Sequence, residues 1–251
     1  MDYATALTRQ NELLGQLVGD ADPSTPVPTC PGWSLSQLVR HVGRGDRWAA
    51  QIISDRVDHY LDPRTVRDGK PPAEPEALVP WLSESPRTLL EAVAAAGEQT
   101  PVWTFIGARP ATWWVRRRLH ESTVHRADAA LALGRDYELE APLAADGLSE
   151  WLDLVAARAG GDGPPPLEDG TTLHLHATDE GLGAAGEWLL HGGPDGVRWE
   201  SGHAKGDCAV RGPAVELLLV VLRRRPLEQA QGVQLFGDAG VLSTWLDRTA
   251  F

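Results

Sequence analysis

The sequence predicts an α+β protein of two domains: an N-terminal four-helix bundle with a long crossover, and a small C-terminal α+β domain with an antiparallel sheet. Apolar residues recur at helical spacing in four segments of the first 135 residues. A glycine- and proline-rich run begins at residue 160, and beyond it apolar and polar residues alternate with the period of two that is typical of strands. We therefore expect domains at residues 1–145 and 146–251.

The first two helices are separated by a clear break. Residues 3–19 place leucines and a valine on one helical face. The proline-rich segment 22–28 interrupts this pattern, and Ser34 is suited to cap a second helix that runs to about residue 55. The polar link that follows, at residues 58–72, is long enough to cross the whole bundle.

The remaining elements complete the bundle and build the second domain. A third helix is expected at about residues 84–97, and a fourth at about 110–133, where Gly134 stands at a C-cap position. In the second domain we expect helices at residues 146–159, 213–224 and 239–249, and strands at 171–177, 187–191, 197–200, 207–211 and 233–236. Strands packed under helices make this half an α+β domain.

Composition excludes several functional classes. A net charge of -12 leaves no basic surplus to neutralise phosphates, which argues against a nucleic-acid partner. No apolar run approaches the ~20 residues that a membrane helix needs, so no membrane partner is expected. Cys30 and Cys208 are too few for a disulfide framework, and the N-terminus has no signal-peptide pattern. A cytoplasmic protein is therefore expected.

Three residues carry the chemistry that the sequence predicts. Glu121 and His125 stand four residues apart in the fourth expected helix, which puts both side chains on one face. His41 lies in an otherwise apolar stretch of the second helix. Because bundle cores build metal sites from facing helices, these two imidazoles and one carboxylate indicate a divalent metal site with open coordination positions.

A protease motif is excluded at the same place. His120 and Glu121 resemble the start of the His-Glu-x-x-His motif of zinc proteases, but His125 comes one residue too late. On a straight helix the side chains of His120 and His125 lie roughly 140° apart, so they cannot chelate one ion. Glu121, and not His120, is the expected partner of His125.

Longer motifs surround these residues. The segment Cys-Pro-Gly-Trp-Ser-Leu-Ser-Gln-Leu-Val-Arg-His-Val-Gly begins at Cys30, and Arg-Arg-Arg-Leu-His-Glu-Ser-Thr-Val-His-Arg-Ala-Asp-Ala begins at Arg116. Further motifs begin at Gly212, Arg224 and Phe236. Together they resemble the mycothiol-dependent maleylpyruvate isomerase family over nearly the whole chain.

The resemblance implies a DinB-like metal-binding N-terminal domain and a small α+β C-terminal domain. It also implies a divalent metal, typically zinc, at His41, Glu121 and His125, the same residues that helix spacing indicates. The implied cosubstrate is mycothiol, a thiol of actinobacteria. A metal of this kind favours the thiolate form of a thiol, and the thiolate is the nucleophile.

The expected function is therefore that of a mycothiol-dependent S-transferase or isomerase acting on a small electrophile. An isomerase of the family would add the thiol to an activated double bond, let the bond rotate and eliminate the thiol again. We expect Arg117 and Arg224 to bind an anionic substrate or the polar groups of the thiol, although solvated surface charge also explains such arginines.

Two other functions stay open at this point. Two histidines and one carboxylate are also the ligand set of non-haem iron oxygenases, although those sites usually lie in β-barrels. A metal-binding regulator or carrier without turnover would keep the bundle and its site.

Four histidines fall in the expected strand region: His174, His176, His191 and His203. Without carboxylate companions beside them in the sequence, they are expected to lie on the strand surface and not to form a second metal site.

Overall fold

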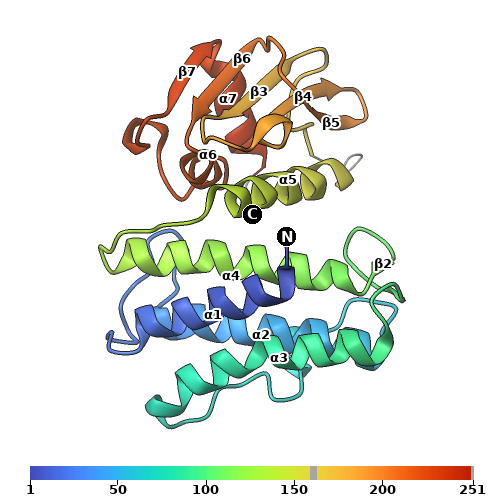
Figure 1. Ribbon diagram of the computed structural model, residues 1–251, viewed down its shortest axis with the longest axis vertical. Helices are drawn as coiled ribbons and strands as arrows, with labels where there is room; N and C mark the ends of the chain where they lie inside the picture. Colours follow the sequence, from blue (N-terminus) through green and yellow to red (C-terminus); the bar gives the residue numbers. More distant parts are fainter. Residues whose placement is uncertain (159–162, 250–251) are drawn as a thin grey trace. The chain divides into compact units, whose positions relative to one another are not determined.

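The computed structural model describes residues 1–158 and 163–249, and the chain divides into two compact units, Met1–Tyr137 and Glu138–Phe251 (Figure 1). The division precedes helix α5 (Ala141–Ala157), whereas the boundary expected at 145/146 falls inside that helix. The helix begins earlier than expected because a proline stands in its first turn, where the missing N–H costs no hydrogen bond. The start of the glycine- and proline-rich run lies outside the described residues.

Four α-helices build the first unit: α1 (Tyr3–Val18), α2 (Leu35–Ser54), α3 (Leu78–Ala96) and α4 (Thr112–Ala132). The core of this unit contains fully buried leucines from all four helices, among them Leu7, Leu14, Leu38, Leu82, Leu89 and Leu119. Ser34 caps α2 as predicted and forms a reciprocal pair with Gln37. α3 starts earlier than predicted, since Pro80 lies in its first turn, where proline is tolerated.

The links between these helices hold short elements. Two 3-10 turns, η1 (Pro63–Thr65) and η2 (Pro75–Ala77), lie between α2 and α3. Two short antiparallel strands, β1 (Pro101–Val102) and β2 (Arg109–Pro110), lie between α3 and α4.

Helices α2 and α3 run side by side in the same direction. Gly43 faces Trp81, and one turn further along both helices Asp46 accepts a hydrogen bond from Ser85 at 2.7 Å. The connection between the two helices therefore has to return along the length of the unit, as Figure 1 shows. α1 packs against α3 and α4, and α4 also contacts α2 (Figure 1).

The close contact of α2 with α3 depends on a glycine. A Cβ atom added at Gly43 would overlap the ring of Trp81, over which the guanidinium of Arg47 lies at 4.3 Å. We predict that Gly43→Ala destabilises the protein by about 1–3 kcal/mol, because overpacking outweighs the ~1 kcal/mol by which alanine favours a helix. Urea denaturation measures the effect. Arg40→Ala, an exposed change on the same helix, is the control and should stay within ~0.5 kcal/mol; equal stability of the two variants would contradict the prediction.

The second unit combines a five-stranded sheet with three α-helices in its described residues. The strand order is β5 (Gly196–Ser201), β4 (Glu187–Gly193), β3 (Thr172–Ala177), β6 (Cys208–Gly212), β7 (Gln234–Gly237). The described helices are α5, α6 (Ala214–Val221) and α7 (Ala239–Arg248), with 3-10 turns η3 (Gly183–Gly186) and η4 (Leu227–Gln229). The expected antiparallel pairing holds except between β3 and β6, which run parallel and make the sheet mixed.

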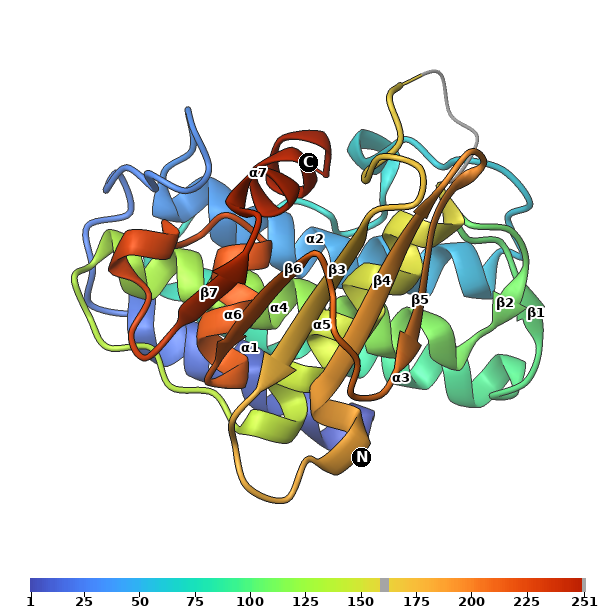
Figure 2. The same ribbon diagram turned by 90° about the horizontal axis from the view of Figure 1, so that it is seen from above.

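The two faces of the sheet differ. Leu173 and Leu175 on β3 are fully buried, and Trp188, on the same face, donates a hydrogen bond to Ser149 of α5 at 2.9 Å. Because side chains alternate along a strand, His174 and His176 lie on the opposite face. Figure 2 shows α5 and α6 behind the sheet. Within the described residues, no helix has the length and apolar composition for crossing a bilayer.

Candidate functional site

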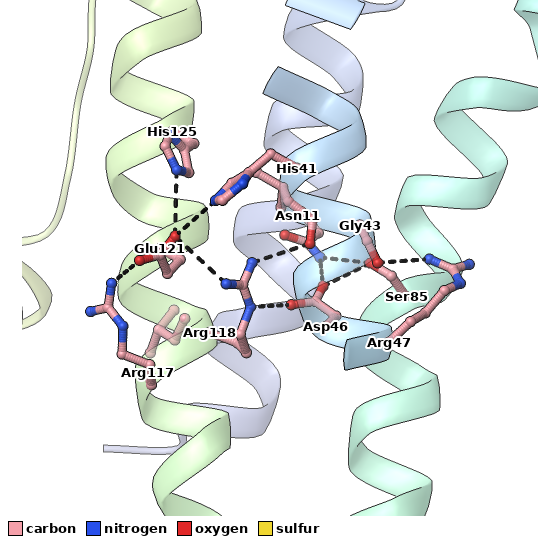
Figure 3. A network of polar contacts seen from close by, with 12 residues as sticks. Asn11, His41, Gly43, Asp46, Arg47, Ser85, Arg117, Arg118, Glu121 and His125 are labelled. Carbon is pink, nitrogen blue, oxygen red and sulfur yellow. Dashed lines mark hydrogen bonds and ion pairs between the residues drawn. The ribbon is translucent and has the colours of Figure 1, made fainter. Parts of the chain in front are cut away.

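Helices α2 and α4 bring the three predicted residues together (Figure 3). Oε2 of Glu121 lies 3.2 Å from Nε2 of His41 and 3.4 Å from Nε2 of His125. The centres of the two imidazole rings are 4.8 Å apart, and the ring planes are nearly perpendicular. The two helices run in opposite directions here, since Arg118 of α4, one turn before Glu121, donates to the carbonyl of Val42 on α2.

The two oxygens of the Glu121 carboxylate contact different side chains. Oε2 faces both imidazoles, and Nη1 of Arg118 lies 3.6 Å from it. Oε1 accepts a hydrogen bond from Arg117, which stands one helical turn earlier. Two guanidinium groups therefore hold the carboxylate in a fixed direction.

His125 is oriented from its other side by a residue that the sequence interpretation did not assign. Nδ1 of His125 lies 2.9 Å from Oδ2 of Asp128, and the thiol of Cys30 donates to the same oxygen at 3.4 Å. Burial opposes a charge on His125, but the hydrogen bonds and charges of Asp128 and Cys30 outweigh it and raise the pKa of His125. Because a carboxylate only accepts, Nδ1 carries a proton, and in the neutral ring the lone pair is on Nε2, toward Glu121. The three-residue spacing of His125 and Asp128 was the signal that could have found this pair.

His41 is the most accessible member of the group. Its side chain is 41% exposed, against 18% for Glu121 and 10% for His125. Burial of the ring, followed by the positive charges of His125 and the arginines around it, lowers the pKa of His41 well below its ordinary value. The indole ring of Trp33 lies 4.9 Å from the His41 ring and 6.0 Å from the His125 ring. The site is thus bordered by one aromatic side chain and reached by solvent on the side of His41.

A buried network of polar side chains extends from Arg118 to residues of the neighbouring helices (Figure 3). Nε of Arg118 lies 3.0 Å from Oδ1 of Asp46, whose side chain is fully buried. Oδ2 of Asp46 accepts hydrogen bonds from Asn11 and Ser85, each at 2.7 Å. A Cβ added at Gly45 would overlap the Arg118 guanidinium, so this glycine leaves the space that the arginine occupies. The network holds Arg118, and through it Glu121, between three helices.

The residues present fit a divalent metal ion. His41, Glu121 and His125 each offer one ligand atom, and these three atoms lie within 4.8 Å of one another. Two imidazoles and a carboxylate are a ligand set of catalytic zinc, which keeps a further position open. The contact of His125 with Asp128 is typical of metal-binding histidines, whose second nitrogen donates to a carboxylate. On the other side of the same ring, ligand atoms of Cys30, His125 and Asp128 also lie within 4.8 Å of one another.

The two arginines expected to bind substrate lie in different units. Arg117 is buried beside Glu121. Arg224 belongs to the second unit, after α6, and donates a hydrogen bond to the carbonyl of Leu222 at 2.8 Å. The structure therefore brings Arg117 together with the three candidate ligands, and the roles of both arginines in substrate binding stay predictions.

Known proteins resemble both halves of the chain. Residues 4–130 match the family model described as the mycothiol maleylpyruvate isomerase N-terminal domain, and residues 142–244 match the MDMPI C-terminal domain. An uncharacterized protein of Mycobacterium tuberculosis, found in two strains, is 28% identical over 172 residues, which are 66% of this chain and 86% of that protein.

Two solved structures share the fold. The crystal structure of the mycothiol-dependent maleylpyruvate isomerase has a TM-score of 0.59 with this chain at 15% identity, covering 93% of this chain and 91% of the other. A mutant of that enzyme with a histidine replaced by alanine has a TM-score of 0.58, with the same identity and coverage. At this level of identity the likeness concerns the fold.

Proposed function

The chain belongs to the mycothiol maleylpyruvate isomerase family, and from this premise we propose that it is an enzyme that activates a small thiol for attack on a small electrophile. We propose mycothiol as the thiol and a zinc-type divalent ion as the metal. The observation that carries the proposal is the convergence of His41, Glu121 and His125 from two helices, together with the contact of Asp128 behind His125.

The residues of the site have separate roles in this proposal. His41, Glu121 and His125 would hold the ion through Nε2, Oε2 and Nε2. A divalent ion bound there supplies positive charge that lowers the pKa of an incoming thiol. Arg117 and Arg118 hold the Glu121 carboxylate in a fixed direction.

Access and substrate binding follow from exposure and charge. The partly exposed side of His41 is the side from which a thiol can approach. We propose that Arg117 and Arg224 bind an anionic substrate or the polar groups of the thiol. The reaction outcome, isomerisation or transfer, depends on the electrophile, because both reactions begin with attack by the same thiolate.

The test uses the purified wild-type protein. Elemental analysis should find close to one equivalent of a divalent ion in this site, or the protein should accept one on loading. Titration with mycothiol should release protons, and incubation with a maleylpyruvate-type substrate or a simple electrophile should give the cis–trans isomer or the thiol adduct. A protein that cannot be loaded with metal would overturn the proposal, whereas activity with glutathione alone would overturn only the choice of mycothiol.

Asp128 offers a test of how the site is oriented. We predict that Asp128→Asn weakens metal binding at this site by about 10- to 100-fold, the usual effect of losing a carboxylate behind a histidine ligand. Cys30→Ser is the matched control, because a hydroxyl can still donate to Asp128. Metal affinity is measured by competition with a chelator. A large loss in both variants would instead place the ion on the Cys30 side of the ring, where Cys30 and Asp128 would both be ligands.

A further inference from the structure

A second group of four side chains converges in the second unit: His174, His176, Glu187 and His203. Two are on the central strand β3, one is at the start of β4, and one follows β5. Antiparallel pairing sets Glu187 directly opposite His176, and neighbouring strands put paired residues on the same face. The sequence-based expectation that these histidines have no carboxylate companion is therefore wrong, because strand register supplies one from the next strand.

All three imidazoles approach one oxygen atom. Oε2 of Glu187 lies 2.7 Å from Nδ1 of His203, 3.1 Å from Nε2 of His174 and 3.6 Å from Nδ1 of His176. The contacts with His203 and His174 are hydrogen bonds and take the two lone-pair directions of this oxygen, whereas the contact with His176 is too long for a hydrogen bond. Hydrogen bonding to Glu187 alone therefore does not account for the convergence of three rings.

The rings are arranged as they would be around an ion. Their centres form a nearly regular triangle with sides of 5.4, 5.7 and 5.9 Å. An ion bound tetrahedrally, at ~2.1 Å from each ring nitrogen, would hold the ring centres roughly 5 Å apart. The observed sides of the triangle are longer than this by less than about 1 Å, a difference that small rotations of the side chains can remove.

One side of this group of four side chains is buried, and the other side is open to solvent. The side chain of His174 is 4% exposed and that of Glu187 18%, while those of His176 and His203 are 26% and 74% exposed. Nε2 of the buried His174 ring lies 3.1 Å from Oε2 of Glu187, so these two groups hold each other in position on the sheet. An ion could therefore enter from the side of His203 and meet an ordered ligand on the sheet.

From this geometry we propose that His174, His176, Glu187 and His203 form a binding site for a divalent transition-metal ion such as Zn²⁺, Co²⁺ or Ni²⁺ in the second unit. Three imidazoles and one carboxylate, without a thiolate, suit these borderline ions better than Mg²⁺ or Ca²⁺, which prefer oxygen ligands. Four protein ligands fill a tetrahedral shell, which is characteristic of a structural ion and not of a catalytic one. The site joins β3, β4 and the segment after β5, so the ion would stabilise that edge of the sheet.

The test measures Co²⁺ and Zn²⁺ binding to the full-length protein after chelation. The wild type should bind one more equivalent of metal than His176→Ala or His203→Ala. If a variant still binds this equivalent, its affinity for the ion should be more than about 100-fold lower, because losing a group that only orients a ligand already lowers metal affinity 10- to 100-fold. His203 is largely exposed, so its replacement should leave the fold intact. The matched control is His191→Ala, because His191 lies on the same face and pairs with Glu200 at 3.0 Å, outside the group.

The outcomes separate this site from the one in the first unit. His41→Ala should retain the second-unit equivalent, and its Co²⁺ spectrum should show tetrahedral coordination without a thiolate band. If His176→Ala, His203→Ala and the wild type bind the same number of ions with the same affinity, the proposal is overturned, whatever the first unit binds. Loss of an equivalent in His191→Ala to the same extent would also overturn it.

Discussion

Replacing His125 by alanine should abolish metal binding in the first unit and lower thiol-dependent activity by at least ~100-fold. This residue is the most buried of the three candidate ligands and the only one with a carboxylate behind it. Its loss would leave one imidazole and one carboxylate, too few to hold a zinc-type ion firmly, and even disturbing a group behind a ligand costs about 10- to 100-fold. Elemental analysis and kcat/KM with the thiol and an electrophile measure the two effects.

The control for this variant is His59→Ala. His59 is also a histidine beside a carboxylate, Asp58, but both side chains are exposed on the link between α2 and α3. Its replacement should change neither metal content nor kcat/KM. Near-UV circular dichroism shows whether His125→Ala keeps the tertiary structure. A folded His125→Ala protein with full metal content and activity would refute the assignment of this ligand.

Replacing Asp46 by alanine should destabilise the protein by about 3–5 kcal/mol, the usual cost of removing one member of a buried ion pair. The Asp46 side chain is fully buried and accepts from Arg118, Asn11 and Ser85. Removing it takes the carboxylate from a guanidinium that is itself buried, and takes acceptors from two polar groups. The midpoint and slope of urea denaturation measure the change.

Asp55→Ala is the matched control for this prediction. Asp55 also pairs with an arginine, Arg67, through two contacts of 2.6 and 2.8 Å, but the pair is on the surface. An exposed ion pair contributes about 0–1 kcal/mol, so this variant should remain close to the wild type. Equal destabilisation by the two aspartate variants would mean that burial of Asp46 has no special role.

Local patterns were sufficient to predict most of the helical unit. Ser34 and Gln37 form the cap that their spacing indicates, and Glu121 and His125 share a helix face because four residues make about one turn. His41 was proposed as a ligand because it coincides with the Glu121 and His125 pair in a four-helix bundle, where facing helices build metal sites. α3 begins at Leu78, before the expected start at about residue 84, and its first turn contains Pro80, a position that tolerates proline.

Features that join distant segments could not be predicted in this way. Asp46 meets Arg118, 72 residues later, and nothing near either residue in the sequence indicates this pairing. Glu187 became a companion of three histidines only through the register of β3 and β4. The parallel pairing of β3 with β6 depends likewise on which strands become neighbours, and alternation along a single strand carries no information on that choice.

The parallel course of α2 and α3 determines how the first unit can fold. Asp46 and Ser85 are 39 residues apart, and Gln10 of α1 receives its hydrogen bond from Arg126, 116 residues later. α1 packs against α3 and α4, so it finds its partners only after most of the unit has been made. Because these contacts join residues far apart in the sequence, folding of the unit should be slower than that of a bundle whose helices pair through tight turns. During synthesis, the apolar face of α1 cannot be fully buried until α4 has left the ribosome.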